Sequence, residues 1–131
     1  MKEIVAETVK VLKKGGVILY PTDTIWGIGC DALNEDAVSA VYAVKQRDFS
    51  KSMLILVDSI EMLEKYVEIV PPAALQLIEA AKRPLTIIYP KAKNIAKNLI
   101  AADGTIGIRV VNDEFCKIMI RELGAPVVST S

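Results

Sequence analysis

The sequence predicts an α/β fold in which helices flank a twisted, mixed β-sheet, and two observations carry this prediction. Short runs rich in Val, Ile and Leu alternate along the chain with segments whose apolar residues recur at helical spacing. Hydrophobic residues make up 52% of the 131 residues and aromatic residues only 5%, so the core must be aliphatic. A chain of this length forms one domain that buries a core without needing disulfides or metal ions.

The first predicted elements are a helix and a strand. Apolar residues at helical spacing between charged ones predict an amphipathic helix over residues 2–14, and the glycine pair 15–16 ends it. Residues 17–20 form an apolar run typical of a buried strand. Pro21 should end that strand, because proline has no amide hydrogen to donate to a sheet ladder.

A second helix is predicted with Asn34 as its N-cap and its end near residues 45–47. Its buried side should consist of Ala37, Val38, Val41, Tyr42 and Val44. Residues 53–57 are the next predicted strand. Asp58 and, three residues later, Glu61 match a capping pattern for a further helix.

The rest of the chain continues this alternation. Helices are predicted over residues 71–81, where a proline pair can only begin a helix, and over residues 113–123, which Gly124 ends. A short helical piece should lie around residues 95–100. Strands are predicted over residues 85–89, 105–111 and 126–128.

The most informative segment spans residues 20–32. It places hydroxyls, a carboxylate and glycines in one turn directly after a strand, and open α/β sheets bind ligands at the carboxyl ends of their strands. Gly27 and Gly29 allow positive backbone dihedral angles and a close approach of the main chain to a ligand. Turns of this composition also occur where nothing binds, so spacing alone leaves both interpretations open.

Composition excludes several classes of function. The chain has no histidine, which removes Ser-His and Cys-His nucleophile pairs and histidine metal ligands, and no metal site is predicted. Sixteen basic residues balance sixteen acidic ones, which argues against a surface that attracts nucleic acid or anionic lipid as a whole. Cys30 and Cys116 are far apart in the sequence and favour reduced thiols in a cytoplasmic protein. No apolar stretch approaches the roughly 20 residues that span a bilayer, so no membrane association is expected.

Three places carry candidate functional residues. Lys45 and Arg47 end a helix, where cations either stabilise the helix terminus or clamp an anion such as a phosphate chain. Arg109 is a lone charge inside an apolar strand, so it either lies at a sheet edge or faces a polar cavity. Residues 129–131 are three hydroxyls after a strand, a pattern that a frayed polar terminus shares.

Six blocks of the sequence, taken in order, resemble the YrdC-like family of threonylcarbamoyl-adenylate synthases. The blocks are residues 16–24, 27–32, 45–47, 83–86, 104–110 and 126–131. They span nearly the whole chain, and their combination is far more specific than any single block. The resemblance implies one YrdC-like domain over residues 1–131, incomplete at its C-terminus, because the family domain continues further.

The resemblance also implies an activity, the condensation of L-threonine, bicarbonate and ATP into threonylcarbamoyl-adenylate with release of pyrophosphate. Mg²⁺ would accompany ATP, and a tRNA threonylcarbamoyl transferase complex would use the product to modify the adenosine beside the anticodon. Such a reaction needs no histidine and no covalent nucleophile, because phosphorus transfer depends mainly on positioning and charge stabilisation.

On the nucleotide side, the resemblance assigns roles to four residues. Lys45 and Arg47 match the Lys-x-Arg pair that contacts the phosphates, and they are the catalytic candidates. Thr105 and Ser131 match further nucleotide contacts.

The resemblance also assigns roles in threonine binding to four residues. Thr22 and Thr24 match the part of the motif that holds the amino acid, and Ser129 matches a hydroxyl beside it. Arg109 matches the arginine that pairs with the amino-acid carboxylate.

Three departures from the family pattern stand beside these matches. Asp48 and the step 51–52 replace a proline and a Lys-Pro step, and Trp26 replaces a frequent tyrosine. The asparagine of a Ser-x-Asn motif would follow Ser131 by two positions. Two alternative functions stay open: a related carbamoyl-adenylate activity, as in hydrogenase maturation factors, and a module that binds tRNA or double-stranded RNA without catalysis.

Overall fold

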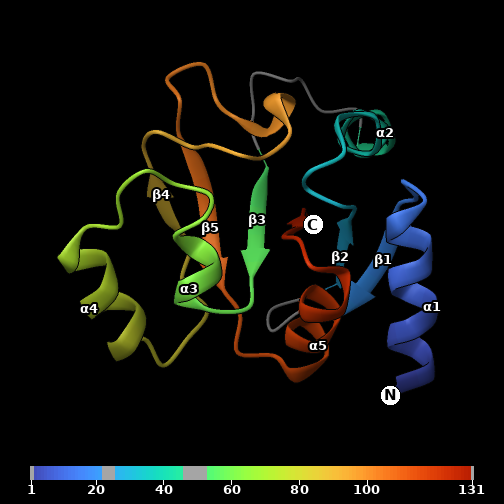
Figure 1. Cartoon of the computed structure of the whole chain (residues 1–131), viewed down its shortest axis with the longest axis horizontal. Coiled ribbons are helices and arrows are strands. Elements are labelled where there is room, and N and C mark those ends of the chain that lie inside the picture. Colours follow the sequence, from blue (N-terminus) through green and yellow to red (C-terminus); the bar gives the residue numbers. More distant parts are fainter. Residues whose placement is uncertain (1, 22–25, 46–52, 131) are drawn as a thin grey trace.

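The computed structural model describes residues 2–21, 26–45 and 53–130, whose central feature is a four-stranded sheet (Figure 1). The sheet consists of β3 (Leu54–Val57), β4 (Ile87–Tyr89), β5 (Ile106–Val110) and β6 (Val127–Ser129), in the order β4-β5-β3-β6. β3 is parallel to β5 and antiparallel to β6, while β4 is antiparallel to β5. The sheet is therefore mixed, which confirms the predicted fold class.

A hairpin of β1 (Ile18–Pro21) and β2 (Trp26–Gly29) forms a second, two-stranded antiparallel sheet. The chain of β2 runs beside β6, because Ile28 and Thr130 exchange backbone hydrogen bonds of 2.7 and 3.1 Å. The prediction that a single turn follows Pro21 was wrong in one respect: Gly27 and Gly29 lie in an extended strand and not at positive φ angles. The hairpin thus extends the larger sheet beyond β6.

Helices surround these sheets. They are α1 (Lys2–Lys13), α2 (Glu35–Lys45), α3 (Ile60–Leu63), α4 (Pro72–Ala80), α5 (Glu114–Leu123) and the 3₁₀ helix η1 (Lys97–Leu99). Asn34 caps α2 as predicted, since its side-chain oxygen accepts a 3.0 Å hydrogen bond from the amide of Ala37. The cap of α3 is Ser59 and not Asp58, because the Ser59 hydroxyl accepts from the amide of Met62 and donates to Asp58.

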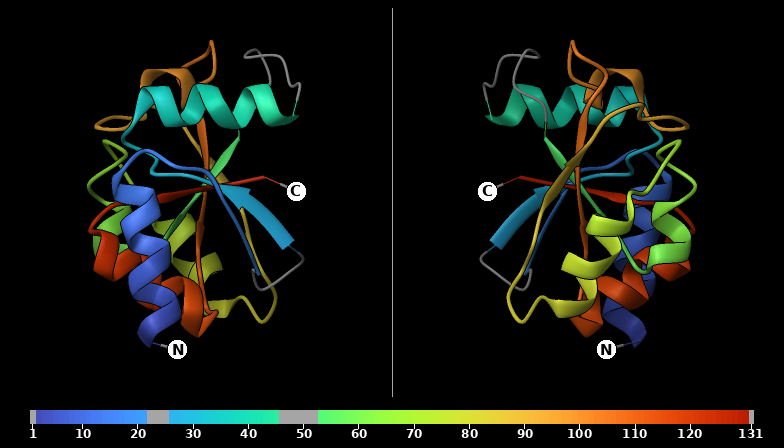
Figure 2. Two further views of the ribbon diagram at one scale, coloured as in Figure 1. Left: turned by 90° about the vertical axis from the view of Figure 1, so that its right-hand side faces the viewer. Right: turned by 90° about the vertical axis from the view of Figure 1, so that its left-hand side faces the viewer.

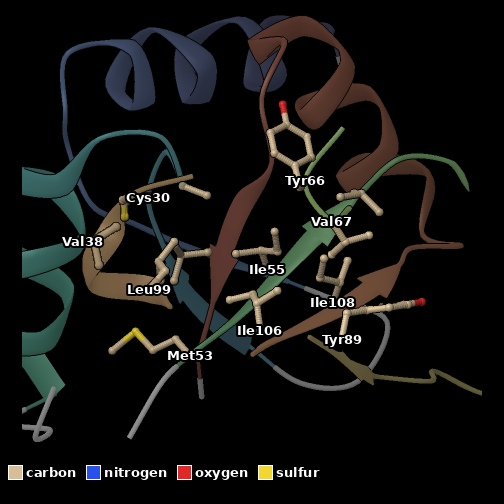
Figure 3. Close-up of a cluster of buried hydrophobic side chains, with 14 of the residues drawn as sticks. Cys30, Val38, Met53, Ile55, Tyr66, Val67, Tyr89, Leu99, Ile106 and Ile108 are labelled. Carbon is tan, nitrogen blue, oxygen red and sulfur yellow. The ribbon is translucent and has the colours of Figure 1, made fainter. Parts of the chain in front are cut away.

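Two apolar clusters pack against opposite faces of the four-stranded sheet, since successive strand residues point to opposite sides. Figure 3 shows the first cluster, in which Ile55, Ile106 and Ile108 of the sheet meet residues of α2 and η1. The second cluster joins Leu56 of β3 to α1 and α5. The prediction that Val44 belongs to the buried side of α2 is wrong, because this side chain is 61% exposed.

No helix in the described part of the chain is long and apolar enough to cross a membrane.

Candidate functional site

Arg109 lies in the interior of the sheet. Its strand, β5, is flanked by β3 and β4, so the prediction of an edge position is wrong. Ile87 pairs with Ile108, which places Thr86, just before β4, opposite Arg109. The guanidinium donates two hydrogen bonds to the Thr86 hydroxyl, from Nε at 3.1 Å and from Nη2 at 2.9 Å. The alternative prediction was that Arg109 faces a polar cavity with a partner, and the structure supplies the partner, the Thr86 hydroxyl.

Ser129 shares the sheet face of Arg109. Arg109 is the register partner of Leu56, and Ser129 that of Leu54, two residues earlier on the same strand. Residues two apart on a strand point to the same side, so both polar side chains lie on the face of Leu54 and Leu56. Neighbouring strands are about 4.8 Å apart, so β5 and β6 are separated by about 10 Å, a span that suits a small molecule.

One end of this face is more exposed than the other. Leu56 is 1% exposed beneath α1 and α5, whereas Leu54 and Ser129 are only half-buried. Ile88 on β4 is 70% exposed and pairs with Gly107. Because glycine has no side chain, the surface of the sheet is recessed at this position. The half of the face that holds Gly107 and Ser129 is therefore accessible to a ligand, and the half-buried Arg109 lies where this half meets the covered one.

Tyr20 lies beside these residues and was missed as a candidate. Burial raises the pKa of its hydroxyl well above the ordinary value, while the Ser129 hydroxyl and, more weakly, the Arg109 charge act in the opposite direction. The phenol is therefore neutral at physiological pH and donates a 3.0 Å hydrogen bond to the Val128 carbonyl oxygen. Its place directly before Pro21, at the end of a strand, was the signal available in the sequence.

Thr105 directly precedes β5 and follows a turn in which Gly104 has a φ of +83°. Its hydroxyl donates a 2.6 Å hydrogen bond to Asp103, and its amide donates to the same oxygen at 3.1 Å. These bonds lower the pKa of the Asp103 carboxyl below its usual range. Toward a ligand, the Thr105 hydroxyl can therefore only accept, since its proton is held by Asp103.

Lys45 is the last residue of α2 and is half-buried. Figure 2 shows that this end of α2, the ends of β1 and β2 near Pro21 and Trp26, and the end of β6 lie on one side of the molecule. The ends of α2 and β6, the elements whose last residues are Lys45 and Ser129, thus lie on a common side. The other predicted site residues, Thr22, Thr24, Arg47 and Ser131, lie outside the described residues.

The described residues contain no group of three or more His, Cys, Asp or Glu side chains that could hold a metal ion. Cys30 and Cys116 are buried and not bonded to each other. Burial, and more weakly Asp31, raises the pKa of the Cys30 thiol to about 12, so this thiol stays protonated and unreactive at neutral pH.

The chain is similar to known proteins over nearly its whole length. The family model Sua5_yciO_yrdC, described as telomere recombination, matches residues 10–131. A threonylcarbamoyl-AMP synthase of Pseudoalteromonas translucida is 36% identical over 130 residues, which are 97% of this chain and 70% of that protein. One of Coxiella burnetii is 31% identical over 126 residues, which are 95% of this chain and 68% of that protein.

Solved structures show the same fold. P. abyssi Sua5 complexed with L-threonine superposes with a TM-score of 0.91 at 25% identity, over 97% of this chain and 38% of that one. E. coli YciO gives a TM-score of 0.87 at 26% identity, over 100% of this chain and 64% of that one. The chain thus spans about two thirds of these synthases and well under half of the Sua5 chain.

Proposed function

The chain belongs to the Sua5/YciO/YrdC family, and from this premise we propose that it catalyses the formation of L-threonylcarbamoyl-adenylate from L-threonine, bicarbonate and ATP. The relatives named above carry the corresponding enzyme name, and one related structure holds L-threonine. The proposed location is the cytoplasm, where a tRNA threonylcarbamoyl transferase complex would use the product.

The observation that carries the proposal is the position of the half-buried Arg109 inside the sheet, at the border of the accessible half of its face. A guanidinium that is held in the sheet interior and half-buried attracts a carboxylate strongly, because charge-assisted pairs gain strength where water is restricted. In the proposed complex, Arg109 binds the carboxylate of threonine. Ser129, with Thr22 and Thr24 of the hairpin segment, contacts the rest of the amino acid.

The nucleotide lies on the side where α2 and β6 end. Lys45, together with Arg47, neutralises charge on the phosphates, and Thr105 and Ser131 contact the nucleotide. The amine of threonine condenses with bicarbonate to give a carbamate and water. A carbamate oxygen then attacks the α-phosphorus of ATP and displaces pyrophosphate. Residues of this chain hold the two substrates in line and offset the developing negative charge. Mg²⁺ would enter with ATP and neutralise the pyrophosphate that leaves.

The experiment that tests the proposal measures pyrophosphate release with each substrate omitted in turn. Release should require threonine, bicarbonate and ATP together, and labelled bicarbonate should enter a product that contains adenylate. Serine lacks one methyl group, so it should be used about 10–200-fold less efficiently than threonine. ATP turnover that does not depend on threonine would overturn the proposal.

The same assay separates the alternatives. A carbamoyl-adenylate activity would release pyrophosphate from ATP without threonine once a donor of the carbamoyl group is supplied. Binding of tRNA or double-stranded RNA without catalysis would weaken steeply with added salt, because phosphate contacts release counterions. The balanced charge of the chain, with sixteen basic and sixteen acidic residues, favours the enzymatic function.

A further inference from the structure

We propose that Thr86 is a positioning residue for the threonine substrate, which acts by fixing the guanidinium of Arg109. This inference rests on the proposed function and adds a residue to it. The Thr86 side chain accepts both Nε–H and one Nη2–H of Arg109 on a single oxygen, at 3.1 and 2.9 Å. Two bonds from one planar group to one atom determine how that group is turned.

The edge of the guanidinium that Thr86 engages determines the direction of the other edge. The Nε–H and one Nη2–H lie along one side of the planar guanidinium, and Thr86 fixes that side against β4. The end of the group consists of Nη1 and the second Nη2 hydrogen, two parallel donors whose spacing matches a carboxylate. Once the side is fixed, this end has one orientation relative to the sheet face.

Thr86 is itself held in place. Its methyl carbon Cγ2 would lie only 3.3 Å from a Cβ added at Gly107, so the methyl group packs over the glycine. A β-branched side chain has few χ1 rotamers, and this packing favours one of them. The threonine thus offers a fixed acceptor, whereas a longer polar side chain would be mobile.

A fixed guanidinium binds a carboxylate more tightly than a mobile one, because less freedom is lost on binding. The hydroxyl of Thr86 uses both of its lone pairs on Arg109, so its own proton points away from the guanidinium. Thr86 should therefore influence the affinity for the amino acid and not the affinity for the nucleotide.

The test compares two substitutions of similar size. Thr86→Val keeps the branched shape and removes the oxygen, whereas Thr86→Ser keeps the oxygen and removes the methyl group. Thr86→Val should raise the KM for threonine about 10-fold, the effect of one lost hydrogen bond to a charged group, with the KM for ATP unchanged. Thr86→Ser should lie between the wild type and Thr86→Val, because it keeps the oxygen and loses the packing of the methyl group over Gly107. Equal increases in both KM values, or a serine variant as impaired as the valine variant, would overturn the inference.

A matched control is Thr8→Val in α1, where the threonine hydroxyl bonds only within its helix, to the Ile4 carbonyl oxygen at 2.7 Å. This variant should leave both KM values unchanged. Thermal melting of every variant verifies folding, and Thr86→Ala serves as a second variant without the oxygen if Thr86→Val does not fold.

A second measurement does not depend on activity. The Nε–H of Arg109, assigned by its loss in Arg109→Lys, should give an NMR signal protected from solvent exchange in the wild type and in Thr86→Ser. The signal should lose its protection in Thr86→Val. Protection that survives in Thr86→Val overturns the positioning role, whereas a wild-type protein that shows this protection but no threonine-dependent activity overturns only the proposed function.

Discussion

The hydroxyl of Tyr20 donates a 3.0 Å hydrogen bond to the carbonyl oxygen of Val128, 108 residues away in the sequence. The bond joins β1, which leads into the proposed threonine-binding segment, to β6, which carries Ser129. Tyr20 is 1% exposed, so water does not compete for this contact. Two parts of the candidate site are thereby held at a fixed distance from each other.

Replacing Tyr20 by phenylalanine should lower the free energy of unfolding by about 0.5–1.5 kcal/mol, the net contribution of one buried hydrogen bond. Urea unfolding monitored by circular dichroism measures the difference. Tyr89→Phe is the matched control, because the hydroxyl of Tyr89 has no hydrogen-bond partner in the described part of the chain. If both variants lose the same stability, the Tyr20 hydroxyl has no special role in joining the strands.

Gly29→Ala should destabilise the protein by about 1–3 kcal/mol, because a side chain at this position overpacks the junction of β2 and β6. An added Cβ would collide with the Val128 carbonyl oxygen and lie 2.7 Å from Cε1 of Tyr20. Gly107→Ala is the comparison, since the nearest neighbour of an added Cβ there is a side-chain methyl carbon at 3.3 Å and not a backbone atom. Melting temperatures of the two variants should differ clearly, and a Gly29→Ala protein as stable as Gly107→Ala would contradict the close packing.

The protein should lose stability as the pH rises above 9. Burial raises the pKa of the Cys30 thiol from 9.0 to about 12, so the unfolded chain releases this proton first. The contribution of Cys30 to stability is therefore fully present below pH 9, and it falls by up to about 1.4 kcal/mol per pH unit between pH 9 and 12. Urea unfolding at pH 8, 9, 10 and 11 measures the slope, which should be shallower in Cys30→Ala. A slope that this substitution does not change would show that Cys30 is not its cause.

Lys45→Ala should weaken ATP binding about 10- to 150-fold, the loss of one charge-assisted contact to phosphate. Its effect on stability should be small, at most about 1 kcal/mol, because a cation at a helix C-terminus contributes no more than this. Lys13→Ala is the matched control, since Lys13 is the last residue of α1 as Lys45 is of α2. Calorimetric titration with ATP should separate the two variants, and equal affinities would assign Lys45 a structural role only.

Local features of the fold could be predicted from the sequence because they depend on neighbouring residues. Asn34 caps α2, the proline pair at residues 71–72 begins α4, and Gly124 ends α5 with a φ of +77°. Each of these signals acts within one helical turn. The family was likewise readable from short motifs in a fixed order, and the family model confirms it.

Short strands were harder to predict, since they contain too few residues to show a period. β2 contains four residues, two of them glycines, and the pattern indicated a turn. Its strand conformation comes from pairing with β1 on one side and with Thr130 on the other. The exposure of Val44 could not be predicted from the helical pattern either, because only the position of the neighbouring elements decides which side of α2 is covered.

The sequence by itself determined which elements form, where most of them begin and end, and which residues are candidates for chemistry. Only the tertiary structure decided that Arg109 lies inside the sheet opposite Thr86, and that Tyr20 reaches Val128. The physical reason is that these contacts join residues 23 and 108 positions apart. Their formation depends on strand order and register, which the packing of the whole chain sets and which no local pattern of residues specifies.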